Sequence, residues 1–120
     1  MKKIAVIDDN DVNRKLFQKF LIHQYEVKLY NNAIDFIQSL SDEHAIPDLI
    51  ILDIMMPDMT GYEVAKYLKS RDSFKHIKII VCSALNSEVD IEKAEDLQVD
   101  DYLVKPVNHQ DLLLSVGQLI

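Results

Sequence analysis

The stretch Leu49–Asp53 reads Leu-Ile-Ile-Leu-Asp, four apolar residues followed directly by a carboxylate. A short, continuously apolar run is typical of a strand that is covered on both faces, since a strand with one wet face would alternate. Ile4–Ile7 has the same character and is followed by the acids Asp8 and Asp9. We therefore predict two central strands, each of which ends in acidic side chains.

Three further short apolar runs lie along the chain, at Val27–Tyr30, Ile77–Val81 and Tyr102–Val104. They are rich in the β-branched and aromatic residues that fit a pleated sheet. The run Val27–Tyr30 carries Lys28 in its middle, and a charged residue there favours an edge strand. The sequence therefore predicts five strands in all.

Apolar residues with helical spacing lie after each of these strands. In chain order they are Val12, Leu16 and Phe20; Ile34, Ile37 and Leu40; Val64 and Leu68; Ile91 and Ala94; and Leu112, Val116 and Leu119. The residues predicted to cap these helices are Asp11, the pair Asn31 and Asn32, Thr60, Asn86 or Ser87, and Asn108. Thr60 and Glu63 have the spacing of a capping box, in which each side chain accepts from the other residue's backbone N–H. Five helices are expected.

Strand and helix alternate five times without a long linker, which predicts an α/β fold of (βα)5 type. Right-handed crossovers then give a doubly wound, parallel five-stranded sheet with helices on both faces. Five units are too few for a closed eight-stranded barrel. The 120 residues form a single domain, residues 1–120.

Composition excludes several classes of protein. The formal net charge of −7 argues against binding to nucleic acid or to an anionic membrane surface, both of which need a basic face. One cysteine, Cys82, excludes an internal disulfide and a zinc site built from cysteines. No apolar run resembles a signal peptide or approaches the roughly 20 residues of a spanning helix. We therefore expect a cytoplasmic protein that binds neither nucleic acid nor membrane directly.

Chemically active side chains follow four of the five predicted strands. They are Asp8, Asp9, Asp53, Ser83 and Lys105. The carboxyl ends of parallel strands share one edge of the sheet, where ligands bind in open α/β folds. Two carboxylates 4 Å apart repel by about 4 kcal/mol at an effective dielectric of 20. Such a cluster favours Mg²⁺, and an aspartate that lies beside a cation and a lysine is suited to accept a phosphoryl group.

These residues lie in motifs that resemble the receiver domain of two-component response regulators, of CheY-like type. The matching motifs are Asp8-Asp9, Asp53 with the stretch from Met56 to Gly61, Ser83-Ala84, and the stretch from Asp100 to Pro106. The resemblance covers the whole chain, and the intervals between the motifs also match. It implies the flavodoxin-like strand order 2-1-3-4-5.

The resemblance also implies a role for each residue of the acidic cluster. Asp53 would accept the phosphoryl group from a histidine kinase or a histidine phosphotransfer protein. Asp9, Asp53 and the main-chain carbonyl of Met55 would bind Mg²⁺, and Asp8 would hold it through water. The protein would be a signalling phosphoacceptor that catalyses only its own phosphorylation and dephosphorylation.

Further residues would sense the phosphoryl group. Lys105 would pair with it, Ser83 would donate a hydrogen bond to it, and Tyr102 would turn inward as Ser83 moves. The bond between Lys105 and Pro106 is expected to be cis. The surface of the fourth helix, fifth strand and fifth helix would then change and control a downstream protein or self-association.

Two positions bear on the lifetime of the phosphoryl group. Met55 and Leu85 would border the approach of water, and neither can orient or deprotonate it, so the resemblance predicts slow hydrolysis.

Gln98 and Val99 stand where the family often has Gly-Ala. This departure lies away from the site. The helix that ends at Ile120 fits either a stand-alone receiver or a piece of a larger protein.

Two other functions share part of this pattern. A phosphatase of the haloacid dehalogenase type also uses an aspartate at a strand end and Mg²⁺, but expects a second aspartate two residues later, where this chain has Met55. A receiver-like interaction module that is never phosphorylated would be favoured by loss of Asp53, Lys105 or one of the other acids. All of these residues are present.

Overall fold

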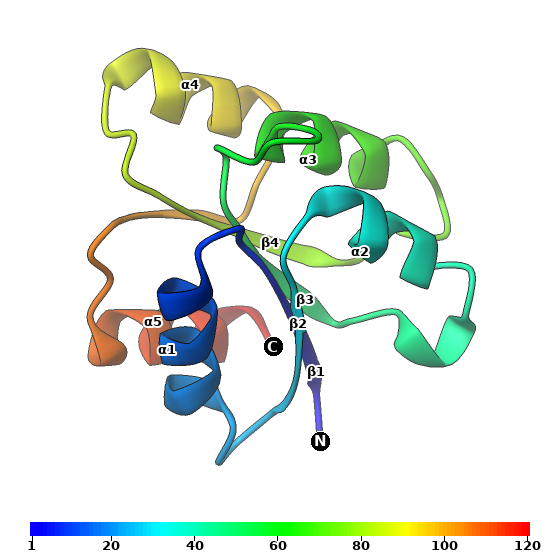
Figure 1. Cartoon of the computed structure of the whole chain (residues 1–120). Coiled ribbons are helices and arrows are strands. Elements are labelled where there is room, and N and C mark those ends of the chain that lie inside the picture. The colour runs from blue at the N-terminus through cyan, green and yellow to red at the C-terminus, as the bar shows by residue number, and fades with distance from the viewer.

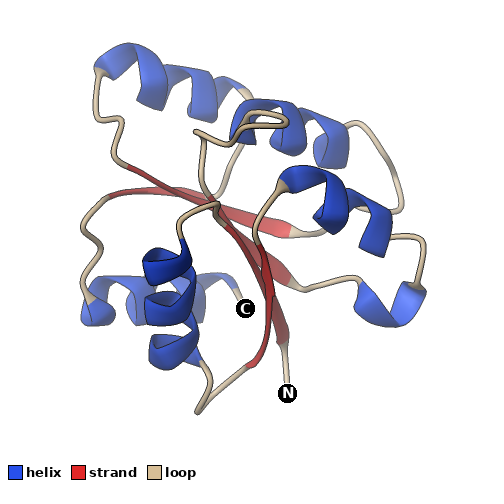
Figure 2. Cartoon of the chain, viewed as in Figure 1, coloured by secondary structure: helices blue, strands red, loops and turns tan.

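A computed structural model describes all residues 1–120. The strands are β1 Lys3–Ile7, β2 Glu26–Tyr30, β3 Leu49–Leu52, β4 Lys78–Ser83 and β5 Asp101–Val104. The helices are α1 Asp11–Leu21, α2 Ala33–Ser39, α3 Gly61–Lys69, α4 Glu88–Asp96 and α5 His109–Leu119, with a 3₁₀ turn η1 at Glu43–Ala45. All strand pairs are parallel and their order is β2-β1-β3-β4-β5 (Figures 1 and 2). The predicted (βα)5 doubly wound fold is confirmed.

Helices cover both faces of the sheet. Helices α1 and α5 lie on one face, and α2, α3 and α4 lie on the other (Figure 1). Alternate residues of β1 therefore enter different cores: Ile4 and Val6 pack toward α1 and α5, while Ala5 and Ile7 pack toward α2 and α3. No helix is long and apolar enough to cross a membrane.

The strands differ in burial as their composition predicts. β3 is buried throughout, and β1 is buried from Ile4 onward, because both lie inside the sheet. β2 is an edge strand whose Glu26 and Lys28 are exposed, which confirms the inference from the charge in its middle. Cys82, in β4, is 1% exposed, and burial raises the pKa of its thiol far above the usual value.

The prediction for the first helix was wrong in its cap and in its phase. Asn10, not Asp11, is the N-cap, and its side chain accepts from the backbone N–H of Asn13. Val12 and Leu16 are exposed, whereas Phe17 and Leu21 are the buried residues. The helix carries apolar residues on more than one face, so packing against the sheet and α5, which periodicity does not contain, selects the buried one.

The other helices follow their predicted caps more closely. The side chains of Asn32, Thr60, Ser87 and Asn108 each accept from a backbone N–H three residues later, and Thr60 forms the complete capping box with Glu63. In α2, however, Ile34 is exposed, and the buried residues are Ala33 and Phe36. In α4 only Ala94 is fully buried.

Helix α4 ends in a Schellman motif. The N–H of Gln98 donates to the carbonyl of Glu95, and the N–H of Val99 donates to the carbonyl of Ala94. This motif requires a left-handed residue, and Gln98 has φ of 61°. The position favours glycine, so the departure Gln98-Val99 noted in the sequence places a strained residue at the end of α4.

Candidate functional site

The carboxyl ends of the strands bring the predicted acids together. Ile7 of β1 pairs with Leu52 of β3, so the residues that follow them, Asp8 and Asp53, leave the sheet side by side. Asp8 and Asp53 are 1% and 7% exposed, while Asp9 is open to solvent. One carboxylate oxygen from each of the three lies within 4.8 Å of the others. Two buried acids and one exposed acid therefore form an acidic cluster.

Lys105 lies inside this cluster. Its Nζ is 2.7 Å from Asp8 Oδ2 and 3.5 Å from Asp53 Oδ2. Burial lowers the pKa of Lys105, but its hydrogen bond to Asp8 and the charges of Asp53 and Asp8 outweigh burial, so the pKa is raised above its usual value. The lysine is therefore fully charged at neutral pH and neutralises only part of the acidic cluster.

Asp53 has a raised pKa. Burial is the largest cause, and the neighbouring charge of Asp8 adds to it, while Lys105 opposes both. The carboxylate form of Asp53 is thus less favourable than in water, and a cation beside it would stabilise that form. This is a carboxylate whose environment favours a new positive partner.

The three carboxylates fit a hard divalent cation. Mg²⁺ prefers oxygen ligands, usually keeps several waters and takes one or two carboxylates from the protein. Asp9 and Asp53 supply such oxygens at the rim of the cluster, where solvent reaches Asp9. The donor set of the cluster therefore suits Mg²⁺.

Sequence reasoning missed a residue that positions Asp8. The guanidinium of Arg14 donates to the main-chain carbonyl of Asp8 at 2.7 Å and to Asp11 Oδ1 at 2.9 Å. The N–H of Asn10 donates to Asp8 Oδ1 at 2.9 Å. An arginine one turn into a helix that follows an acidic pair is the sequence signal for such a contact. These hydrogen bonds fix the loop that carries Asp8 and Asp9.

The loop between β3 and α3 packs tightly on the backbone of Asp53. A Cβ added to Gly61 would lie 2.4 Å from the carbonyl oxygen of Asp53 and 2.9 Å from Ile54 Cα. The N–H of Gly61 also donates to the carbonyl of Ile54 at 2.9 Å. Only glycine permits this approach, so the start of α3 rests directly against the candidate acceptor.

Asp58, in the same loop, was also missed. Its carboxylate accepts from the backbone N–H groups of Ala33 and Ile34, at 3.3 and 2.9 Å, and so caps α2 from a distant part of the chain. Burial raises the pKa of Asp58, but these hydrogen bonds outweigh it and the pKa is lowered. The signal in the sequence is only an acid in a loop, because the partner helix is 24 residues away.

The other side of the site contains Ser83 and Tyr102. Ser83 is 0% exposed at the end of β4, and its Oγ accepts from the N–H of Leu85 at 3.1 Å. The hydroxyl of Tyr102, in β5, donates to the carbonyl of Leu85 at 2.7 Å. Leu85 therefore joins the two residues that were predicted to respond to a phosphoryl group.

The remaining predicted residues lie around this edge. The Lys105–Pro106 peptide bond is cis. Met55 is 62% exposed, and Leu85 is half-buried and packs against the core beneath α3 and α4. Met55 is thus open to solvent, whereas Leu85 is partly covered by the core.

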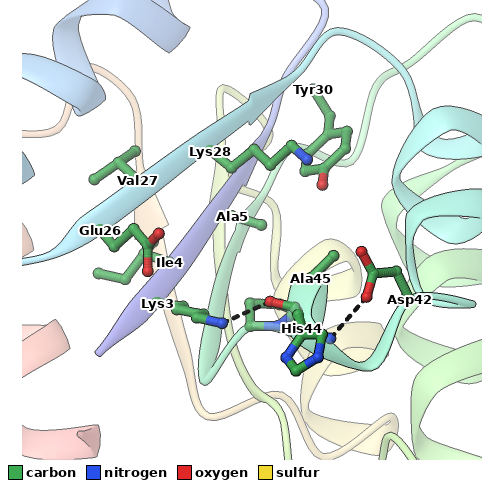
Figure 3. Close-up of a pocket in the computed structure, with 11 residues that line it drawn as sticks. Lys3, Ile4, Ala5, Glu26, Val27, Lys28, Tyr30, Asp42, His44 and Ala45 are labelled. Atoms are coloured by element: carbon green, nitrogen blue, oxygen red, sulfur yellow. Dashed lines mark hydrogen bonds between the residues drawn. The ribbon is translucent and has the colours of Figure 1, made fainter. Parts of the chain in front are cut away.

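One cavity of the protein lies away from this site. It has a volume of about 290 Å³, lies between the edge strand β2 and η1, and contains none of the site residues (Figure 3). Two hydrogen bonds lie within its lining: Lys3 Nζ donates to the carbonyl of His44, and the N–H of His44 donates to Asp42 Oδ1. This cavity is therefore separate from the acidic cluster, which lies on an open, charged edge of the sheet.

Comparison with known proteins gives the same assignment as this geometry. The family described as response regulator receiver domain matches residues 4–117. The chain belongs to this family. The prediction made from the motifs is confirmed.

Individual relatives agree with the family. The polar-differentiation response regulator DivK of Brucella anthropi is 33% identical over 108 residues, which are 89% of this chain and 86% of DivK. The BeF3-activated receiver domain of DrrB superposes with a TM-score of 0.90 at 28% identity, covering 99% of this chain and 97% of that one. The phosphorylated cyanobacterial phytochrome response regulator RcpA gives 0.83 at 32% identity, covering 98% and 90%.

Proposed function

We propose that this receiver is a phosphoacceptor of two-component or phosphorelay signalling in the cytoplasm, which takes its phosphoryl group on Asp53. The observation that carries the proposal is the Asp53 carboxylate, 7% exposed at the end of β3 and 3.5 Å from Lys105 Nζ. The similar proteins RcpA and DrrB were solved in phosphorylated and BeF3-activated forms. The donor would be a histidine kinase or a histidine phosphotransfer protein.

The transfer uses few protein groups. An oxygen of Asp53 forms a bond to phosphorus, the bond from phosphorus to the donor imidazole breaks, and its electron pair leaves with the imidazole nitrogen. Lys105 lies where it can pair with the transferred phosphoryl oxygens, at the cost of part of its contact with Asp8. Ser83 can donate its hydroxyl once the phosphoryl group is present.

Asp9, Asp53 and the main-chain carbonyl of Met55 would hold Mg²⁺, with Asp8 acting through water. The ion would supply positive charge to the phosphoryl oxygens. A ligand that binds only the folded state at 100 times its Kd stabilises that state by about 2.7 kcal/mol. Mg²⁺ should therefore raise Tm, and Asp9→Asn should raise Tm without the metal and remove the effect of Mg²⁺. Equal midpoints with and without Mg²⁺ in the parent protein would contradict this role.

The phosphoacceptor role is tested by intact mass after incubation with acetyl phosphate and Mg²⁺. We expect one adduct with the mass of a phosphoryl group, about 80 Da, which Asp53→Ala abolishes. Turnover of phosphate esters without an adduct would indicate the phosphatase alternative. A folded parent protein that forms no adduct with acetyl phosphate or with a phosphorylated histidine phosphotransfer protein would indicate an unphosphorylated interaction module.

The output would be a change in the surface of α4, β5 and α5. Leu85 accepts from Tyr102 and donates to Ser83, so a phosphoryl group that draws the Ser83 hydroxyl away would disturb the position of Tyr102. The changed surface would bind a downstream protein or a second copy. Amide chemical shifts should change along α4 and β5 when BeF3 and Mg²⁺ are added. Changes confined to the neighbours of Asp53 would contradict this output.

Met55 and Leu85 would prolong the life of the phosphoryl group, because hydrolysis needs a water in line with phosphorus and neither side chain can orient one. One well-placed hydrogen-bonding group commonly changes such a rate by about 10². The double variant Met55→Asn, Leu85→Glu should therefore lose its phosphoryl group faster than the parent. Equal decay rates would remove this role from both residues.

A further inference from the structure

A groove lies between α4 and β5 on the face opposite α1 and α5. Its volume is about 290 Å³, and it is lined by Ile91, Ala94, Glu95, Val99, Asp100, Asp101 and Tyr102. Its lining combines apolar side chains with three acids, Glu95, Asp100 and Asp101. The groove exists because α4 buries only Ala94 and leaves Ile91 half-exposed above the sheet. We call this feature the α4–β5 groove.

The charge around the α4–β5 groove is unusually one-sided. The segment from Glu88 to Asp101 contains seven of the twenty acidic residues of the chain and only one of the thirteen basic ones, Lys93. It therefore carries −6 of the net charge of −7. The acidity of this protein is thus concentrated in the segment that contains α4 and the start of β5.

Most of this charge is uncompensated within the molecule. Glu88, Glu92, Glu95 and Asp96 form no ion pair and their side chains accept no hydrogen bond. Lys93, the one base nearby, instead lies 5.6 Å from the centre of the Tyr62 ring. These four exposed acids of α4 are thus free to pair with positive charge from another molecule, and one of them, Glu95, lines the groove. The other two acids of the groove, Asp100 and Asp101, already accept hydrogen bonds within the protein.

We propose that the α4–β5 groove receives a basic amphipathic segment of a downstream protein. An amphipathic helix that docks in a groove places apolar anchors about one turn apart on the floor, and its other residues lie near the rim. Lysine and arginine there would meet Glu95, which lines the groove, and Glu92, which is exposed about one turn earlier on α4, whereas an acidic segment would be repelled. Local charge of one sign also speeds the encounter with an oppositely charged partner by about 10-fold to 10³-fold.

The inference rests on the proposed function only for its regulation. Tyr102 forms one wall of the α4–β5 groove and is tied to Ser83 through Leu85, so phosphorylation of Asp53 would change the shape of the groove. The preference for positive charge comes from the rim and does not depend on a phosphoryl group. Failure of one claim therefore leaves the other standing.

The test is selection of peptides from a random 16-residue display library on the intact domain, with and without BeF3 and Mg²⁺. The winning peptides are then synthesised and their Kd values measured. We expect net positive peptides with apolar residues three or four positions apart. Their affinity should fall by about tenfold or more in the variant Glu92→Lys, Glu95→Lys, less in Glu92→Gln, Glu95→Gln, and with added salt.

A matched control carries the same change in net charge far from the groove. Glu26→Lys, Glu43→Lys alters two exposed acids near the opposite end of the sheet and should change the Kd by less than about twofold, because such distances are screened. Circular dichroism and Tm show that each variant is folded. The adduct at Asp53 is measured on the same samples, so loss of phosphorylation is seen separately from loss of peptide binding.

Four results would overturn the proposal. The selected peptides could be neutral or acidic, or could bind the Glu92→Lys, Glu95→Lys variant as well as the parent. The library could yield no peptide that binds the folded domain. Sedimentation could instead show a dimer that the groove variant abolishes, which would assign the α4–β5 groove to a second copy of the chain.

Discussion

Helices α3 and α4 follow the two strands that carry Asp53 and Ser83, yet they are attached to the sheet very differently. Helix α3 starts with a reciprocal capping box and buries four residues, Gly61, Val64, Ala65 and Leu68. Helix α4 starts with the Ser87 cap, without a reciprocal capping box, and buries only Ala94. Full burial of a side chain such as valine or leucine contributes roughly 1.5–3 kcal/mol, so α3 is held much more firmly.

This difference separates two tasks. The start of α3 presses on the backbone of Asp53 through Gly61, so it fixes the acceptor in place. Helix α4 stands over a groove and ends in the strained Gln98, so fewer contacts oppose its displacement. Segments with few buried apolar contacts open at lower free energy than the rest of a domain. We infer that the fold is rigid around Asp53, where a phosphoryl group would attach, and more easily displaced at α4, in the surface that would bind a partner.

The sharpest way to break the comparison is Gly61→Ala. The new Cβ would meet backbone atoms of Asp53 and Ile54, which cannot move aside as a side chain could. We expect the free energy of unfolding to fall by about 2–3 kcal/mol, measured by urea denaturation. Gly117→Ala in α5 is the matched control: nothing lies within 4 Å of its Cβ, and alanine should stabilise the helix by up to about 1 kcal/mol. A loss as small as that of an ordinary surface substitution would show that α3 is not pressed against the acceptor.

A second test removes the hydrogen bonding between the two helices. The hydroxyl of Tyr62 in α3 donates to the main-chain carbonyl of Asp90 in α4 at 3.0 Å. Burial, with the nearby Asp90 carboxylate, raises the pKa of Tyr62 to about 12, so the hydroxyl remains a donor at all ordinary pH values. Tyr62→Phe should lower the free energy of unfolding by about 1 kcal/mol and speed amide hydrogen exchange in α4.

Tyr67→Phe is the control for this change, because Tyr67 lies on the same helix and its hydroxyl makes no hydrogen bond to the rest of the protein. It should leave exchange in both helices unchanged. If Tyr62→Phe speeds exchange in α3 as much as in α4, then the two helices open together and the contrast between them is wrong.

The end of α4 offers a gain in stability. Gln98 adopts φ of 61°, and glycine adopts this conformation without the steric cost that a side chain carries. Gln98→Gly should raise the free energy of unfolding by about 0.5–1 kcal/mol, after the greater freedom of glycine in the unfolded chain is counted. Gln98→Ala keeps a Cβ and should give little or no gain. Equal effects of the two substitutions would show that the left-handed conformation is not strained.

The smallest expected effect is a change with pH in the stabilisation that Asp58 provides from the loop before α3. The pKa of Asp58 lies below its ordinary value of 3.8, because backbone N–H groups at the start of α2 bind its ionised form. A lowered pKa in the folded protein means that the stabilisation is present above the pKa of the unfolded chain and is lost as pH falls through the folded value. The difference in free energy of unfolding between the parent and Asp58→Asn should therefore be greatest near neutral pH. It should shrink as the pH falls below about 3.8.

Asp72→Asn serves as the control for pH, since Asp72 is 96% exposed and meets only Lys75. Its difference from the parent should change little over the same range. A gap for Asp58→Asn that widens on acidification would contradict the capping role of Asp58.

The strands and the site were predictable because their signals are local. Four apolar residues before Asp53 mark a buried strand, and parallel strands bring their carboxyl ends together without further information. The phase of α1 was not predictable, since Phe17 and Val12 are equally apolar and only the packing of the finished fold distinguishes them. Arg14 and Asp58 were missed for a related reason. Their partners are backbone atoms, which every residue has, so the sequence does not show which residue they contact.

The single thiol has a practical consequence. Cys82 lies in the strand that ends at Ser83, faces the core under α1 and α5, and is almost inaccessible. Its reaction with an alkylating reagent must wait until that face of the sheet opens. The rate at which Cys82 is alkylated, measured by mass spectrometry, therefore reports how often this side of the domain opens, and no engineered probe is needed. If activation changes only α4 and β5, it should leave the alkylation rate of Cys82 unchanged.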